Sequence, residues 1–101
     1  MANPVRPHLV CYDIRCPKRL ARVHRFLKKR AVPLQYSVFL VRLNREQRGW
    51  LLQQLERLID ARADDVRVYP LPQKPDWCAL GKPLWEEGML LDGVELPPVQ
   101  R

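Results

Sequence analysis

The sequence predicts a single α+β domain in which two helices lie on one face of a small β-sheet. Segments rich in β-branched and aromatic residues alternate with segments whose apolar residues recur every three or four positions, as in amphipathic helices. Prolines and a capping signal separate these segments in the order strand, helix, extended segment, helix, strand. At 101 residues the chain can form one modest core but not two.

The first strand is predicted over residues 8–14, and Asp13 stands near its C-terminal end. Asp13 is the first residue to question, because side chains at strand ends leave the core and become available for chemistry. A carboxylate here can also simply turn the chain by bonding nearby backbone N–H groups. Tyr12 points to the opposite face of the strand, and we expect it to pack in the core.

The first helix is predicted from Lys18 to about Arg30, directly after Pro17, which suits the first helical position because it lacks an N–H. We interpret His24 as a solvated side chain and give it no role. Val32 and Pro33 end the helix, since proline disfavours helical geometry in the residue before it. The apolar face of the helix comprises Leu20, Val23, Phe26 and Leu27.

Residues 34–43 have the composition of extended chain, and the sequence leaves open whether they form one bent strand or two short ones. Phe39 in this segment is expected in the core. Asn44 and Gln47 then form a capping-box pattern that begins a second helix, predicted to run to about Ala61. The core-facing residues of this helix are predicted to be Leu51, Leu55, Leu58 and Ile59, with Trp50 and Leu52 widening that face.

After a turn at residues 64–65, residues 66–69 alternate as a half-buried strand does, and residues 77–80 form a short candidate strand. This order predicts a ferredoxin-like βαββαβ sandwich over residues 1–81. The remaining tail, residues 82–101, contains an extra strand or apolar segment that we expect to pack on its own core or on a neighbouring subunit. The sheet face without helices lacks a cover, so we also predict a symmetric dimer that stacks these faces.

Charge is distributed unevenly along the chain. Residues 1–30 carry nine basic and one acidic residue, residues 31–75 carry seven and five, and residues 76–101 carry two and five. The net charges of +8, +2 and −3 account for the overall +7, and a basic front of this kind indicates a polyanionic partner. The predicted phosphate-binding residues, on the first helix and the loop before it, are Arg15, Lys18, Arg19, Arg22 and Arg25.

The chain is expected to be cytoplasmic. No apolar run approaches the roughly 20 residues of a membrane span, and residues 1–6 lack the apolar region of a signal peptide. Three cysteines without a CxxC pair fit a reducing compartment better than a disulfide framework.

Three short motifs make the prediction specific: residues 12–14 (YDI) before a basic helix, residues 35–39 (QYSVF), and residues 66–71 (VRVYPL). Together they resemble the CRISPR-associated protein 2 family, in the order and spacing of that family, over residues 8 to about 81. The chain departs from the family in lacking the glycine that often follows the first helix, and its tail shows no matching pattern.

This resemblance implies a ferredoxin-like protomer in a symmetric dimer, with the Asp13 carboxylates of both subunits facing each other across a cleft. Two such carboxylates, with waters completing an octahedron, could hold Mg²⁺, and Asp13 is then the catalytic and metal-binding candidate. Gln35 and Ser37 either support that site or satisfy backbone groups at the kink between strands.

Two main functions follow from the resemblance. Members of the family have been described as Mg²⁺-dependent endonucleases on RNA or duplex DNA, and this chain offers one candidate carboxylate for such chemistry. The family dimer also sits between two dimers of the CRISPR-associated integrase and holds the duplex to be inserted as a new spacer. We favour this scaffold role in CRISPR adaptation, with a toxin-like endoribonuclease as the alternative.

Overall fold

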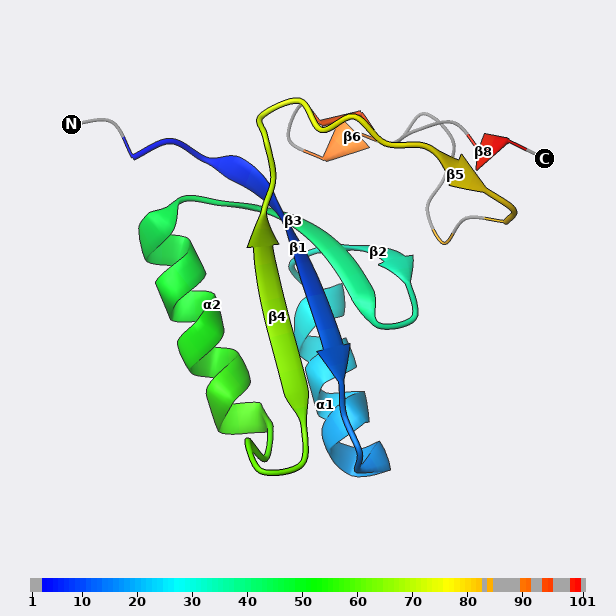
Figure 1. Ribbon diagram of the computed structural model, residues 1–101. Helices are drawn as coiled ribbons and strands as arrows, with labels where there is room; N and C mark the ends of the chain where they lie inside the picture. The colour runs from blue at the N-terminus through cyan, green and yellow to red at the C-terminus, as the bar shows by residue number, and fades with distance from the viewer. Residues whose placement is uncertain (1–2, 83, 85–89, 92–93, 96–98, 101) are drawn as a thin grey trace.

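The computed structural model describes residues 3–82, 84, 90–91, 94–95 and 99–100 (Figure 1). The main sheet contains β1 to β4 in the order β2-β3-β1-β4, and each neighbouring pair is antiparallel. This order and the two helices confirm the predicted ferredoxin-like α+β fold. The elements are β1 (Arg6–Asp13), α1 (Pro17–Lys28), β2 (Val32–Gln35), β3 (Val38–Leu43), α2 (Arg45–Leu58), β4 (Asp65–Pro70), β5 (Ala79–Leu80), β6 (Leu90–Leu91), β7 (Val94–Glu95) and β8 (Val99–Gln100).

The extended segment that the sequence left ambiguous forms two strands. β2 and β3 are antiparallel, and the register shifts between Pro33 and Gln35. Tyr36 and Ser37 form the turn between them, and the Ser37 carbonyl accepts a hydrogen bond from the backbone N–H of Tyr12 at 3.1 Å. The hairpin turn is therefore fastened to β1 one residue before Asp13.

Both helices begin where the sequence predicts and end slightly earlier. Pro17 opens α1, and Asn44 and Gln47 exchange the two hydrogen bonds of a capping box at the start of α2. The backbone N–H groups of Arg30 and Ala31 both bond to the Leu27 carbonyl, which closes α1 before the chain turns into β2. A shared acceptor of this kind is common at helix ends.

The main core lies between the helices and one face of the sheet. Side chains alternate between the two faces of a strand, so every second residue of β1 and β3 points toward the helices. Tyr12 and Phe39 are buried there, as predicted, and their rings stack with centroids 6.2 Å apart. The buried residues of this core are Val10, Tyr12, Ile14, Val23, Leu27, Phe39, Val41, Leu43, Leu51 and Leu55.

Some predicted core residues lie outside it. Leu20, Trp50 and Leu52 are exposed, because each lies at the edge of its helical face, and Trp50 keeps 47% of its surface accessible. Trp50 instead packs beside Phe26, and the Arg30 guanidinium lies 4.1 Å from the Phe26 ring centroid.

The interpretation of His24 as a solvated side chain is wrong. Its ring lies edge-on to Phe39 with centroids 5.5 Å apart, and its Nδ1 is 3.3 Å from the Tyr12 hydroxyl. That hydroxyl also donates to the Tyr36 carbonyl at 3.0 Å. The position of His24 in a predicted helix does not reveal its contacts with Tyr12 on β1 and Phe39 on β3.

The sheet face away from the helices is partly covered by the chain itself. Leu34 and Leu40 are buried there, and Leu71, Trp77 and Ala79 of the segment after β4 pack against them. The expectation of a wholly uncovered face is therefore wrong, since this proline-rich segment crosses back over it. Of the predicted strand at residues 77–80, only Ala79 and Leu80 form a strand, β5, and Trp77 packs against Leu34 and Leu40.

Part of the tail returns to the rest of the chain. β8 pairs in parallel with β5, and β6 pairs with β7. Gly81, with φ of +89°, ends β5 in a backbone conformation that favours glycine. The expected packing of the tail on the core or a partner falls largely on residues 83, 85–89, 92–93, 96–98 and 101, which lie outside the described residues. No helix in the described part of the chain is long and apolar enough to cross a bilayer.

Candidate nucleic-acid interface and carboxylate site

Asp13 is the last residue of β1, and its side chain is exposed. Because Tyr12 faces the helices, the alternation along the strand places Asp13 on the opposite face of the sheet. Within the described residues its carboxylate accepts no hydrogen bond and pairs with no cation. The interpretation of Asp13 as a simple turn residue therefore finds no support in its contacts.

A second carboxylate lies beside Asp13 on the neighbouring strand, β4. Asp65 begins β4 and is the register partner of Asp13, and side chains so paired lie about 5 Å apart at Cβ. Two like charges at directly opposed positions destabilise a sheet. Arg67 reduces this repulsion, because its Nε donates a hydrogen bond to the Asp65 carboxylate at 3.0 Å. Sequence reasoning treated Asp65 as part of a turn, because strand register is a long-range property that the local pattern does not contain.

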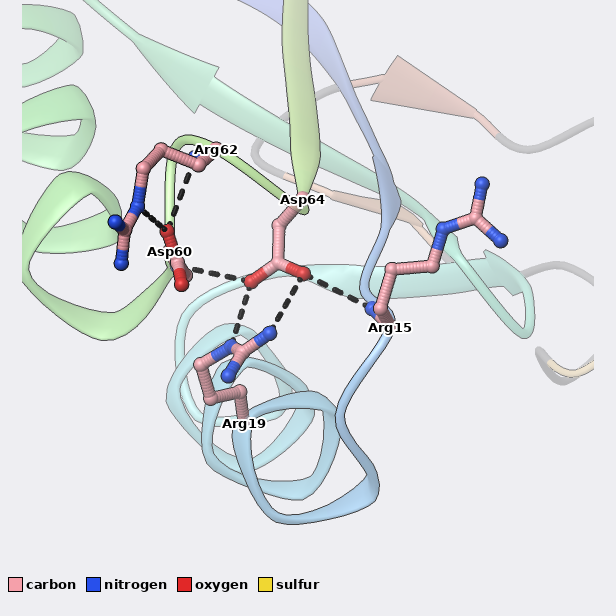
Figure 2. A network of polar contacts seen from close by, with 5 residues as sticks. All are labelled: Arg15, Arg19, Asp60, Arg62 and Asp64. Atoms are coloured by element: carbon pink, nitrogen blue, oxygen red, sulfur yellow. Dashed lines mark hydrogen bonds and ion pairs between the residues drawn. The ribbon is translucent and has the colours of Figure 1, made fainter.

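The turn after β1 is held by Asp64 instead (Figure 2). Its carboxylate accepts hydrogen bonds from the backbone N–H groups of Arg15 and Asp60, each at 2.9 Å. The Arg19 guanidinium forms two further hydrogen bonds to it, at 2.7 and 3.1 Å. The Asp64 side chain is 0% exposed. Its hydrogen bonds join α1, the turn after β1 and the turn after α2.

The electrostatics of this cluster follow from these donors. The Arg19 guanidinium, first among them, and the two backbone N–H groups hold the pKa of Asp64 far below its ordinary value. The same bond raises the pKa of Arg19. Asp64 is thus charged throughout the physiological range, and its charge is neutralised within the cluster. We call Asp13, Asp60, Asp64 and Asp65 together the carboxylate end of the sheet.

The five predicted phosphate-binding residues separate into two kinds. Arg19 is committed to Asp64, and the backbone of Arg15 bonds to the same carboxylate while its guanidinium points away from the cluster (Figure 2). Lys18, Arg22 and Arg25 are exposed, and no carboxylate in the described part of the chain pairs with them.

Arg22 and Arg25 line a depression of about 420 Å³ between α1 and α2. Lys29 and Arg30 stand at the same depression, so that four basic side chains surround an apolar floor that includes Leu58. We call this surface the α1 groove. Sequence reasoning identified Arg22 and Arg25 from their spacing, and the position of α2 adds the other wall.

Gln35 and Ser37 lie at the β2–β3 turn, near the strand end that carries Asp13. Together with Leu34, Tyr36, Lys82 and Leu84 they line a cavity of about 560 Å³. Their side chains form no hydrogen bond with other described residues, so neither satisfies the backbone at the kink. The Ser37 backbone bonds to β1 through its carbonyl, which accepts from the N–H of Tyr12.

No group of three or more His, Cys, Asp or Glu residues in the described ranges is arranged to hold a metal ion. Of the four aspartates at the carboxylate end, only Asp13 is exposed and has no arginine partner among the described residues. Mg²⁺ commonly keeps several waters and takes only one or two protein carboxylates. The donor set of Asp13 therefore fits a largely hydrated ion, with Asp65, its register partner on β4, as a second carboxylate.

The chain is similar to known proteins over most of its length. The profile of the family described as CRISPR associated protein Cas2 matches residues 7–77. A Nitrosomonas europaea protein named CRISPR-associated endoribonuclease Cas2 1 is 48% identical over 86 residues, which cover 85% of this chain and 82% of that protein. A Thermodesulfovibrio yellowstonii protein named CRISPR-associated endoribonuclease Cas2 2 is 44% identical, covering 89% and 94%.

Solved structures show the same fold. The crystal structure of hypothetical protein TT1823 from Thermus thermophilus superposes with a TM-score of 0.70 at 28% identity, covering 78% of this chain and 96% of that one. The crystal structure of Streptococcus pyogenes Cas2 gives a TM-score of 0.60 at 28% identity, covering 65% and 86%.

Proposed function

The chain belongs to the Cas2 family of CRISPR-associated proteins, and we propose that it acts in the cytoplasm as a dimeric, duplex-DNA-binding scaffold in CRISPR adaptation. In this role the dimer bridges dimers of the CRISPR-associated integrase while it holds the duplex to be inserted. The observation that carries the proposal is the contrast between a developed basic surface, the α1 groove, and the few catalytic groups that the described part of the chain places around Asp13.

The α1 groove suits the phosphate backbone of a duplex. Arg22 and Arg25 have no carboxylate competitor in the described part of the chain, so their charges are available to phosphates. Lys18 and Arg15 extend the positive surface toward the start of α1. Contacts of this type position a nucleic acid without reading its sequence, which is what a scaffold for varied spacers requires.

The dimer is supported by the sheet face opposite the helices. The segment after β4 covers the β2–β3 side of that face, while Tyr69 is 45% exposed and Asp13 is accessible. Stacking of two such faces would bring the two Asp13 carboxylates together. Light scattering at micromolar concentration should then give twice the 12.0 kDa chain mass, and a strict monomer would contradict both the dimer and a shared metal site.

The salt dependence of duplex binding tests the α1 groove. Each neutralised phosphate contributes about −0.9 to the slope of log K against log salt concentration. Arg22→Ala with Arg25→Ala should therefore flatten the slope by about 2 and weaken binding of all duplex sequences alike.

The matched control is Arg62→Ala with Lys74→Ala, which removes the same charge from exposed positions outside the groove. If both double variants change the slope equally, the effect reflects net charge, and the α1 groove is not the duplex site.

Endoribonuclease activity is the second candidate. It is favoured by the names of the relatives and by the exposed Asp13, which has Asp65 as its partner on the neighbouring strand. Asp13 would hold Mg²⁺, which when bound polarises a phosphate and lowers the pKa of a coordinated water. Asp13→Asn keeps the shape of the side chain and removes its charge, so it should abolish Mg²⁺-dependent RNA cleavage. Cleavage that persists in purified Asp13→Asn protein would exclude this carboxylate from the chemistry.

A further inference from the structure

A cavity of about 550 Å³ lies at the end of the sheet where β1 begins. It is lined by Arg6 at the start of β1, by Arg45 and Arg48 at the start of α2, and by His8. We call it the arginine cavity. Asp13 lies seven positions after Arg6 along β1, so the cavity lies about 23 Å from Asp13 along the strand.

Strand pairing assembles these residues from distant parts of the sequence. Arg6 lies opposite Leu43, the last residue of β3, and α2 begins two residues later. The pairing therefore brings the start of β1 next to the start of α2, and Arg6, Arg45 and Arg48 line one cavity there. The capping box already occupies the N–H of Gln47. The positive charge of the cavity therefore comes from the arginine side chains and not from the helix end alone.

The charges of the arginine cavity are not balanced. No carboxylate in the described part of the chain forms an ion pair with Arg6, Arg45 or Arg48. Glu46 is the one acidic residue in the lining, so three positive charges face one negative charge and the net charge is +2. Arginines held together without a counter-charge repel one another, and a bound anion relieves that repulsion.

His8 forms the buried wall of the cavity. It is 1% exposed, its Nδ1–H donates to the Arg6 carbonyl at 2.9 Å, and its Nε2 lies 3.5 Å from Nη1 of Arg48. Burial, with smaller contributions from the charges of Arg48 and Arg6, lowers the pKa of His8. The ring is thus neutral at pH 7 and adds no charge of its own, but it reports on any anion that enters.

We propose that the arginine cavity binds a phosphate group, with Arg6, Arg45 and Arg48 as its ligands. Guanidinium groups donate paired hydrogen bonds to phosphate oxygens, and the cavity supplies three of them. A terminal phosphate carries nearly two negative charges at neutral pH, whereas an internal phosphodiester carries one. The net charge of +2 therefore favours the phosphorylated end of a nucleic-acid strand. This site goes beyond the proposed function, since binding of a duplex along the α1 groove does not require it.

Two duplexes of identical sequence test the proposal, one with 5′-phosphate and one with 5′-hydroxyl ends. The wild-type protein should bind the phosphorylated duplex about tenfold more tightly, since charge-assisted hydrogen bonds are lost with the phosphate. Arg45→Gln with Arg48→Gln should remove that preference. Arg57→Gln with Arg62→Gln, exposed and outside the cavity, should retain it. Arg45→Gln alone, at an exposed position, serves if the double variant fails to fold.

A second measurement uses inorganic phosphate as the probe and the NMR resonances of the His8 ring as the readout. Bound phosphate should raise the pH at which His8 titrates, and the Arg45→Gln variant should reduce that shift. A shift with inorganic phosphate but no preference between the duplexes supports the phosphate site and assigns it to a free phosphate or nucleotide. If neither probe gives an effect, the proposal is wrong.

An acidic peptide provides the competing outcome. If oligoglutamate moves the His8 titration while inorganic phosphate does not, the cavity is a docking site for acidic protein and the proposal is also wrong. Failure of the proposed duplex-binding function remains distinguishable, because the Arg22 and Arg25 substitutions change overall affinity and salt slope but leave the preference for 5′-phosphate intact.

Discussion

At the end of the sheet where β1 stops, three aspartates each pair with an arginine, whereas at the end where β1 begins the arginines of the cavity have no such partner among the described residues. In Figure 1 the first end is the lower one, where the chain enters α1 and leaves α2. The upper end carries the start of β1 and of α2. The fold therefore neutralises these three aspartates at the lower end, whereas the arginines at the upper end remain available to a ligand.

Within the carboxylate end the same distinction appears on a smaller scale. The Asp64 side chain is buried and accepts four hydrogen bonds, whereas Asp13, at the end of β1, is exposed and has no partner in the described part of the chain. Asp64 therefore fixes the turn, and Asp13 is left exposed for a cation or a ligand.

The largest effect should come from the buried carboxylate. Asp64→Ala leaves the Arg19 guanidinium and the N–H groups of Arg15 and Asp60 without their acceptor, and breaking a buried ion pair is strongly destabilising. We expect Tm to fall by roughly 10 °C for a domain of this size.

The exposed ion pair of Arg62 with Asp60 is the matched control, since Arg62 keeps 92% of its side-chain surface accessible. Arg62→Ala should shift Tm by less than about 2 °C. If thermal unfolding gives equal changes in Tm for the two variants, burial of Asp64 does not strengthen its ion pair with Arg19.

A smaller effect should appear as a pH dependence at the opposite end. The pKa of His8 is lower in the folded chain than its ordinary 6.5, mainly because the ring is buried and then because Arg48 and Arg6 are near. The unfolded chain therefore binds a proton at a pH where the folded chain does not. The stability that neutral His8 contributes is fully present above about pH 6.5 and is lost as the pH falls below it.

Urea unfolding at pH 7.5 and 5.5 measures this loss, and the His8→Gln variant should show a smaller difference between the two pH values. Asp64 does not obscure the result, because its pKa is also lowered and its contribution is lost only below about pH 4. A wild-type midpoint that is unchanged between the two pH values would contradict the prediction.

Local signals in the sequence predicted most of the fold. Pro17 and the capping box of Asn44 and Gln47 mark helix starts through hydrogen bonds between near neighbours, so they could be identified without the structure. The helix spacing located Val23 and Leu27, but it did not separate them from Leu20 at the edge of the same face.

The sites were harder to predict because they depend on register. Arg6 and Arg45 are 39 positions apart, and only the pairing of β1 with β3 brings them to one cavity. Likewise, Arg19 resembled its neighbours on α1 until the turn after α2 placed Asp64 beside it. A carboxylate 45 positions away decides whether an arginine is available to phosphate, and no helical periodicity reports that.

The smallest effect on stability should come from Asp13, the residue with the most functional interest. Asp13→Asn removes a charge that lies opposite Asp65 and has no partner among the described residues. The free energy of unfolding should therefore change by no more than about 0.5 kcal/mol, toward greater stability. The variant should also remain dimeric and bind duplex with unchanged salt slope, because the α1 groove lies on other elements.

Spacer acquisition in cells that carry Asp13→Asn then separates the two proposed functions. A scaffold needs only the dimer and its basic surface, so acquisition should continue. If acquisition stops while stability, dimer and duplex binding are all intact, the carboxylate itself performs the essential step and the scaffold proposal fails.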